Sequence, residues 1–240
     1  MTSSYVYILV GVGAVLLIGL QIFISRKYSK NRLAKQTGHI NQNPLNEEQK
    51  RLLTFGAILA HYRGENLLNL MPNEILDVYQ QGLRQQWEIT NREQAIQTIG
   101  ELLHLKSTFR FAPIFEQKPE ELSKIQKAIA KGLDVEVEQV QEVNSVYGWD
   151  LCRAASLAKW CYWCNLITED EMWTILQKVS DIAHEHGKSW KEYTISFLLG
   201  RTIQGFDLDD IIIETDRVFN SKNPMLGKVE GIDVYKTYSF

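Results

Sequence analysis

The chain has 240 residues, of which 45% are hydrophobic and 23% are charged. This composition is typical of a folded protein and excludes a mainly disordered chain. The net charge of −3 is unevenly distributed, because residues 1–40 carry five basic side chains and no acid, whereas residues 41–240 carry 21 bases and 29 acids. An acidic domain repels phosphate backbones, so nucleic acid is not an expected partner.

An apolar segment near the N-terminus predicts a membrane anchor. The segment from Tyr5 to Ile24 contains one polar side chain, Gln21. As a helix with a rise of about 1.5 Å per residue, it spans about 30 Å, which matches the hydrocarbon core of a bilayer. A cleaved signal peptide is the alternative, but it begins with basic residues, and Met1–Ser4 contains none. We therefore predict a single transmembrane helix within residues 1–25.

Basic residues after this segment predict its orientation. They are Arg26, Lys27, Lys30, Arg32 and Lys35. Basic flanks stay in the cytoplasm, so the N-terminus is expected outside and the rest of the chain inside. The predicted location is a bacterial inner membrane, with the lipid bilayer as one partner. Residues 26–45 are polar and are predicted to be a linker.

Helix start signals recur in residues 46–240. Thr168-Glu-Asp-Glu171 is a capping box, in which the Thr hydroxyl accepts a free backbone N–H and the Glu side chain reaches back. Similar patterns begin at Asn46, Thr90 and Ser189. These signals predict an all-α fold, with a compact multi-helix soluble domain after the transmembrane helix. The expected helices cover residues 46–62, 73–87, 91–104, 119–131, 146–164, 169–186 and 190–204.

Two stretches of this domain lie outside the predicted helices. Phe109, Phe111 and Phe115 are interpreted as packing residues of a connecting segment. Residues 207–240 contain Asp210-Ile-Ile-Ile-Glu, which fits either a further helix or a short strand.

The three cysteines bear on redox and metal chemistry. Cys161 and Cys164 form a C-x-x-C pattern, which suits a redox pair or half of a zinc site. A zinc site needs two further ligands, and a thioredoxin-like pair needs a βαβ context, and neither is evident here. Both side chains are therefore interpreted as packing residues. An odd number of cysteines, with Cys152 as the third, fits a reducing compartment.

His184-Glu185-His186 resembles a metal motif, but its spacing does not suit one. Zinc-binding His pairs on a helix are usually four residues apart. Side chains two residues apart point about 200° from each other around the helix axis. We expect a solvated helix end here, no metal site, and no cofactor.

Three charged side chains on two predicted helices are the main candidates for a catalytic or binding role. Asp150 and Arg153 lie three residues apart on one helix, and Arg201 lies on a later helix. Arginine binds carboxylates and phosphates through paired hydrogen bonds. The three side chains predict either a buried ion-pair network, which is the default interpretation, or the centre of a site.

Several motifs stand in a characteristic order along the soluble part. Trp149-Asp-x-x-Arg153 is followed by Ser189-Trp-x-Glu-Tyr193 and then by Leu199-Gly-Arg201. In this combination the chain resembles a bacterial family known by number, domain of unknown function 1266, over roughly residues 85–205. The resemblance implies a compact helical fold and brings no activity. The family's motif residues present here are Trp149, Asp150, Arg153, Trp190, Gly200 and Arg201.

These observations favour a non-enzymatic interaction module that is tethered to the membrane and faces the cytoplasm. Tethering raises the effective concentration of a domain near membrane partners, and an acidic surface suits a basic protein partner. One specific form is an accessory or immunity protein of a bacterial secretion or toxin system. The alternative is an enzyme or ligand-binding domain with a site around Asp150, Arg153 and Arg201.

Overall fold

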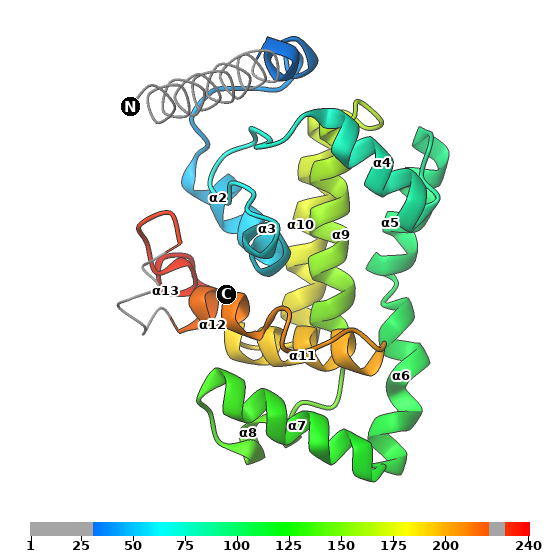
Figure 1. The fold of residues 1–240 in the computed structure, drawn as a ribbon, viewed down its shortest axis with the longest axis vertical. Coiled ribbons are helices and arrows are strands. Elements are labelled where there is room, and N and C mark those ends of the chain that lie inside the picture. The colour runs from blue at the N-terminus through cyan, green and yellow to red at the C-terminus, as the bar shows by residue number, and fades with distance from the viewer. Residues whose placement is uncertain (1–30, 221–228) are drawn as a thin grey trace, which may run out of the picture.

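The computed structural model describes residues 31–220 and 229–240, and these residues are mainly helical (Figure 1). Within them there is no strand, and Val229 and Ile232 form one isolated antiparallel bridge. The predicted all-α class is therefore confirmed. The predicted anchor between Tyr5 and Ile24 lies outside the described residues. Among the residues that are described, no helix has the length and apolar character needed to cross a membrane.

The chain already packs against the domain within the segment predicted as a linker. Residues 31–36 are helical, and Gln36 donates a 2.6 Å hydrogen bond to Asp77. Ile40 and Leu45 are buried in the core. The polar composition of residues 26–45 predicted a free linker, but these apolar side chains hold its second half against the folded domain.

The predicted helix over residues 46–62 is present in three pieces. These are α2 (Glu47–Leu53), the 3-10 turn η1 (Thr54–Gly56) and α3 (Ala57–Tyr62). The capping box of Asn46 and Gln49 is confirmed. The break occurs at Phe55, whose carbonyl accepts a 2.6 Å hydrogen bond from the buried Tyr193 hydroxyl.

The next helices form the right-hand side and the base of the molecule in Figure 1. The capping box predicted at Thr90 is not formed: Asn91 is the N-cap and accepts the Gln94 N–H, while the Gln94 side chain accepts from Thr90. The helix over the phenylalanine segment, α6, was not predicted, and neither was the short α8. The five helices are α4 (Leu76–Trp87), α5 (Arg92–Leu103), α6 (Lys106–Gln117), α7 (Glu120–Leu133) and α8 (Val137–Gln141).

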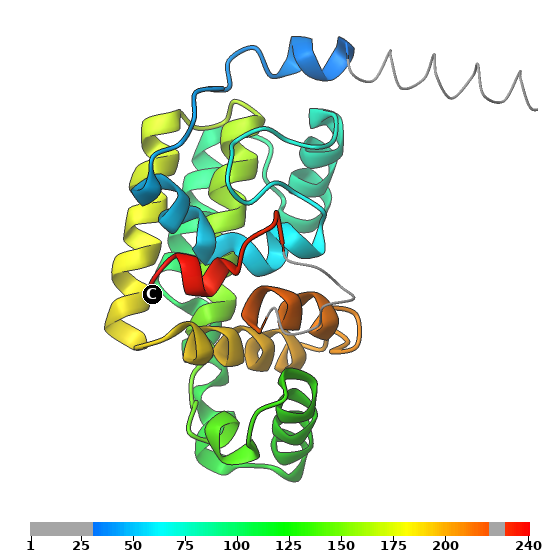
Figure 2. The same cartoon turned by 90° about the vertical axis from the view of Figure 1, so that its left-hand side faces the viewer.

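The helix α9 (Tyr147–Trp163) is the centre of the fold, and all of its residues are buried. It packs against α10 (Glu169–His186), α11 (Trp190–Ile203) and α5 (Figures 1 and 2). The capping box at Thr168 is confirmed. A helix surrounded on all sides carries apolar side chains all around its circumference, so its polar side chains need partners inside the protein.

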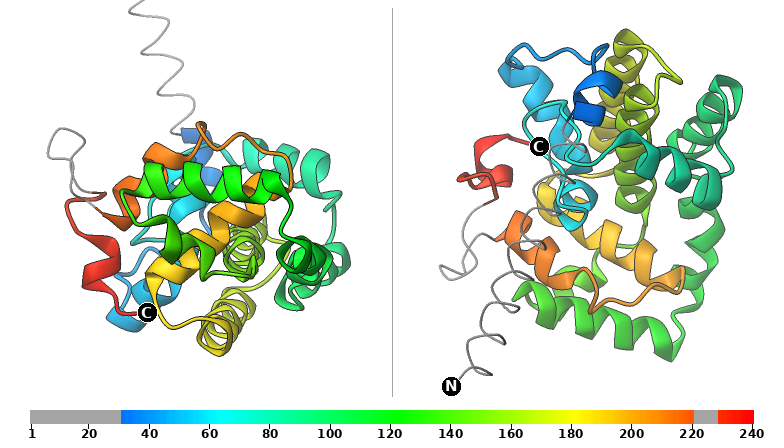
Figure 3. Two further views of the ribbon diagram at one scale, coloured as in Figure 1. Left: turned by 90° about the horizontal axis from the view of Figure 1, so that it is seen from below. Right: turned by 45° about the horizontal axis from the view of Figure 1, so that its top comes forward.

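The C-terminal part of the chain, after residue 207, packs against α11 and its neighbours. The predicted ambiguity after residue 207 is resolved as α12 (Ile212–Phe219), and α13 (Val234–Thr237) follows near the C-terminus. Tyr235 stacks on Trp190 with ring centroids 4.3 Å apart, and the Trp190 indole N–H donates to the Tyr238 carbonyl. Figure 3 shows α7 running along α11 on the opposite side. The C-terminal residues thus cover the start of α11.

Two glycines allow α9 and α11 to cross closely. A Cβ on Gly148 would press into the carbonyl oxygen of Tyr193 and lie 3.0 Å from the Phe197 nitrogen. A Cβ on Gly200 would lie 2.5 Å from the Trp149 Cβ. Backbone atoms cannot rotate away as a side chain can, so the crossing at Gly148 requires glycine.

We therefore expect Gly148→Ala to lower the free energy of unfolding by about 1–3 kcal/mol or more, because the helices must separate. Gly82→Ala is the matched control. Gly82 is half-buried in α4, and a Cβ there would meet no atom within 4 Å apart from the adjacent backbone of its own helix, so alanine there should stabilise the helix by roughly 0.5–1 kcal/mol. Urea unfolding followed by circular dichroism measures both changes. Equal effects of the two substitutions would contradict the close crossing.

Candidate functional site

Asp150 is a fully buried carboxylate that caps a helix distant in the sequence. Its Oδ2 accepts the Thr108 N–H at 3.0 Å, and its Oδ1 accepts the Ser107 N–H at 3.3 Å. The first backbone N–H groups of a helix have no partner within that helix. The N-terminus of α6 is therefore capped by a side chain from α9, and the negative charge is placed where the helix dipole favours it.

Arg153 completes this group and is fixed by several contacts. Its Nη2 donates to Asp150 Oδ1 and to the Ser107 hydroxyl, both at 2.8 Å, and its Nε donates to the Trp149 carbonyl. The guanidinium lies 4.3 Å from the Trp149 ring centroid and 5.8 Å from that of Trp87. Burial lowers the pKa of Arg153, and Asp150 opposes this change by favouring the charged form.

Arg201 does not join Asp150 and Arg153, which corrects the grouping expected from sequence. It forms neither a hydrogen bond nor an ion pair with either of them. Its Nη1 donates to the carbonyl of Asp207, and its guanidinium lies 5.3 Å from the Phe206 ring. Arg201 therefore holds the loop after α11, and the default interpretation of a buried ion pair applies to Asp150 and Arg153 alone.

The remaining motif residues have packing roles. The Trp149 side chain covers Gly200, and its indole N–H donates to Gln204 at 2.7 Å. Trp190 lies among Phe55, Tyr193 and the C-terminal residues. These side chains hold α9, α11 and the C-terminus together.

The cysteines behave as packing side chains in the structure. Cys152 and Cys161 are buried and all three thiols are free. Burial raises the pKa of each thiol to about 12. The thiolate, which is the nucleophile and metal ligand, is therefore scarce at neutral pH. Residues 31–220 and 229–240 contain no group of three His, Cys, Asp or Glu side chains that is arranged to hold a metal ion.

A second buried ion pair was missed by the sequence reasoning. Lys159 of α9 lies 3.0 Å from Glu65 Oε2, and both side chains are almost inaccessible. The other oxygen, Glu65 Oε1, accepts a 2.8 Å hydrogen bond from the Trp160 indole. No local pattern around Gly64-Glu65-Asn66 indicates a buried acid, because its partner lies far along the chain.

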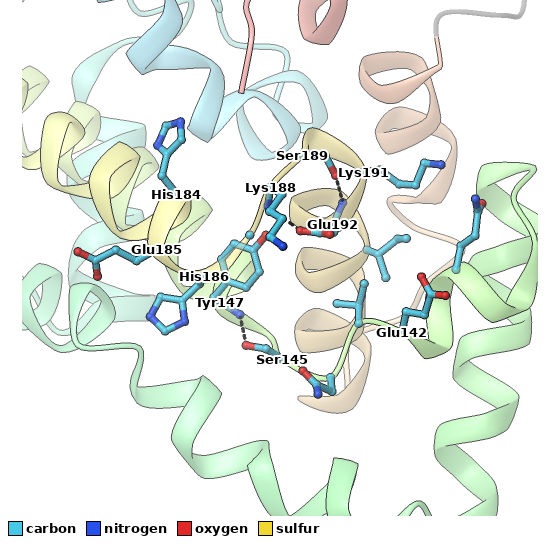
Figure 4. A pocket seen from close by; sticks show the side chains of 15 residues that line it. Glu142, Ser145, Tyr147, His184, Glu185, His186, Lys188, Ser189, Lys191 and Glu192 are labelled. Carbon is cyan, nitrogen blue, oxygen red and sulfur yellow. Dashed lines mark hydrogen bonds between the residues drawn. The ribbon is translucent and has the colours of Figure 1, made fainter.

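One pocket lies where α10 turns into α11, and we call it the α10–α11 pocket (Figure 4). Its volume is about 610 Å³. The Tyr147 ring stacks with that of His186, and Glu192 accepts the Lys188 N–H at 2.6 Å. The predicted helix end at His184-Glu185-His186 forms one side. Glu142 and Glu185 lie at opposite sides of the pocket in Figure 4.

A second pocket, which we call the Arg153 pocket, has a volume of about 540 Å³. It lies between the end of α4, the helix α5, the start of α6 and the end of α11. Arg153 and Gln204 line it together with Trp87. This pocket therefore adjoins the charged group that the sequence singled out, but not Arg201.

Comparison with known proteins gives one family. The family described as "Protein of unknown function (DUF1266)" matches residues 82–218. This range contains α5 to α11, all of α12 except its last residue, and every motif residue singled out from the sequence. No curated protein and no solved structure matches the chain.

Proposed function

Since the chain belongs to DUF1266, a family of unknown function, we infer its role from its own residues and propose a membrane-tethered interaction module that faces the cytoplasm. In this proposal the folded domain binds a protein partner and has no catalytic role.

The hydrogen bonds and the burial of Asp150 are the main support for the proposal that the domain is not catalytic. Both of its oxygens accept hydrogen bonds from α6 or from Arg153, and the side chain is fully buried. A catalytic acid or base needs access to the proton that it transfers. The other motif residues likewise have partners within the fold. These contacts support a structural role for the motif.

The apolar segment from Tyr5 to Ile24 supports the tether. The helical residues 31–36 begin shortly after it, and their side chains reach the domain through Gln36 and Arg32. A tether with so short a connection holds the domain close to the bilayer surface, where its effective concentration toward membrane partners is high.

A basic protein is the partner that the charge distribution favours. Residues 41–240 carry a net charge of −8. The acids that line the α10–α11 pocket outnumber its two lysines, Lys188 and Lys191, by one. Glu142 and Glu185 are exposed, so their carboxylates are accessible to a partner. Opposite charge steers association and selects the partner. A specific form of the proposal is an accessory or immunity protein in a bacterial secretion or toxin system.

Fractionation tests the tether. We expect the full chain to sediment with membranes and to stay there after a high-salt wash, because apolar burial in lipid does not weaken with ionic strength. A chain that lacks residues 1–25 should be recovered in the supernatant. A C-terminal reporter should be active on the cytoplasmic side only. Sedimentation of the truncated chain to the same extent, or a reporter active in the periplasm, would contradict the proposal.

Charge reversal tests the interaction surface. Glu142→Lys combined with Glu185→Lys should abolish cross-linking of the full chain to its membrane partner. Glu116→Lys combined with Asp209→Lys is the matched control, because it makes the same change in net charge at exposed positions outside the pocket. Both double variants should fold normally. Equal loss of cross-linking in both variants would show that overall charge, and not this pocket, determines binding.

A further inference from the structure

The Arg153 pocket combines a cavity with a buried cation that has an unused donor. Its volume of about 540 Å³ lies within the range of small-molecule sites. The side chain of Arg153 is about 10% exposed, and this residue lines the cavity. Nε and Nη2 make its hydrogen bonds. Nη1 has no hydrogen-bond partner among the described residues, so its two N–H groups remain available.

The guanidinium is held in place before any ligand arrives. Its three hydrogen-bond partners belong to Trp149, Asp150 and Ser107, and the Trp149 ring covers one of its faces. Preorganised donors bind an acceptor without the entropy cost of ordering a flexible side chain. An exposed arginine, whose side chain is flexible, would lose this entropy when a ligand binds.

Gln204 adds a second donor next to the same tryptophan. Its side-chain oxygen accepts the Trp149 indole N–H at 2.7 Å. An indole N–H can only donate, so this bond assigns the oxygen to Trp149 and leaves the amide NH₂ free. Gln204 lines the Arg153 pocket too. Trp149 therefore positions two side chains that both offer donors to the cavity.

Donors of this kind select a ligand group that only accepts hydrogen bonds. A carboxylate and a phosphate both meet this requirement. The charges of the side chains around the pocket favour the carboxylate, which carries one negative charge, over the phosphate, which carries two as a dianion. The titratable side chains that line the pocket are Glu88, Glu101, Lys106, Arg110 and Arg153, and together they carry +1.

Asp150 lies behind Arg153 and brings this sum to zero. Glu101 is also paired with Lys106 at 2.7 Å. A singly charged carboxylate is therefore better accommodated than a phosphate dianion, because each additional negative charge is added to a group of side chains whose charges already sum to zero.

The rest of the lining indicates what the body of the ligand contains. Beside the buried Leu102 and the half-buried Trp87, the cavity wall carries the amide side chains Gln85, Gln86, Gln94 and Gln97. Amides donate and accept, so they suit hydroxyl or amide groups on a ligand.

We propose that the Arg153 pocket binds a small polar organic acid, whose carboxylate accepts from Arg153 Nη1 and from the Gln204 amide. The body of such a ligand carries hydroxyl or amide groups, as a sugar acid does. This site is separate from the α10–α11 pocket and does not depend on the membrane tether. A negative result for this site would therefore not contradict the proposed interaction module.

Calorimetric titration of the full, detergent-solubilised chain tests the site with three probes: D-glucuronate, neutral D-glucose and inorganic phosphate. We expect saturable binding of glucuronate and none of glucose. Gln204→Glu should weaken glucuronate binding by about tenfold or more, because it replaces the donor by a negative charge. The substitution keeps an oxygen for the Trp149 N–H, so the fold should survive. The matched control, Gln81→Glu, makes the same chemical change at an exposed position of α4 outside the pocket and should bind normally.

Three outcomes would overturn the proposal. The first is the absence of saturable glucuronate binding by the unaltered chain. The second is equal binding by the Gln204→Glu and control variants, which would place the ligand elsewhere. The third is binding of phosphate but not of glucuronate, which would mean that the donors select a different oxyanion. Unchanged thermal unfolding of the Gln204→Glu variant shows that any loss of binding is local.

Discussion

Replacing Asp150 by asparagine should lower the free energy of unfolding by about 3–5 kcal/mol, because it leaves the Arg153 guanidinium buried without its counter-ion. The same change weakens the cap of α6, since asparagine offers one acceptor oxygen where Asp150 uses two. Chemical denaturation of the full chain in detergent measures the loss. Asp209→Asn, which alters an exposed acid, is the control and should change stability by less than about 0.5 kcal/mol.

A double-mutant cycle separates the charge from the cap. Arg153→Met removes the buried cation and keeps much of the side-chain volume. Combined with Asp150→Asn, it should cost less than the sum of the two single changes, because no unpaired charge remains. Additive losses would mean that the ion pair contributes nothing. An Asp150→Asn variant as stable as the unaltered chain would contradict the structural role on which the proposed function depends.

Glu65→Gln is expected to have an effect of similar size, about 3–5 kcal/mol, through a different part of the fold. The substitution preserves an acceptor for the Trp160 indole but leaves the Lys159 ammonium buried and unpaired. Glu65 also lies 3.3 Å from Arg63 Nε. We expect the segment between α3 and α4, which these contacts hold against α9, to open first. Faster amide hydrogen exchange over residues 66–73 would report this opening.

An exposed ion pair provides the matched control for Glu65. Glu47 lies 2.7 Å from Lys50, and its side chain is 76% exposed, compared with 1% for Glu65. Glu47→Gln should therefore cost less than about 1 kcal/mol, because water screens the charges that remain. The Glu65→Gln, Lys159→Met double variant should recover much of the lost stability. If the Glu65 and Glu47 variants lose the same small amount, the buried pair is not important for folding.

Local sequence signals determined most of the helices. The box at Thr168 and the cap at Asn46 are present as predicted, because each bond joins residues three positions apart. At Ser189, the hydroxyl accepts the Glu192 N–H as expected, but the Glu192 carboxylate accepts from Lys188 instead of reaching Ser189. The resemblance to the family was also visible in the sequence, and the family model that matches residues 82–218 confirmed it.

The helix α6 could not be predicted from the residues at its own start. It contains Pro113, and its own N-cap residue, Leu105, provides no side-chain hydrogen bond. Its cap comes from Asp150, 43 residues away from Ser107. A helix whose start is stabilised from another part of the chain leaves no pattern at its own start.

The sequence by itself determined the helical class, most helix positions, the uneven charge and the set of motif residues, because these depend on side-chain type and short spacing. Only the tertiary structure decided how the charged residues pair. It joined Asp150 to Arg153 and to α6, directed Arg201 to the loop after α11, and buried Glu65 against Lys159. Residues on different helices meet according to how those helices pack, and the pairing of buried charges follows from that packing, which spacing along the chain does not specify.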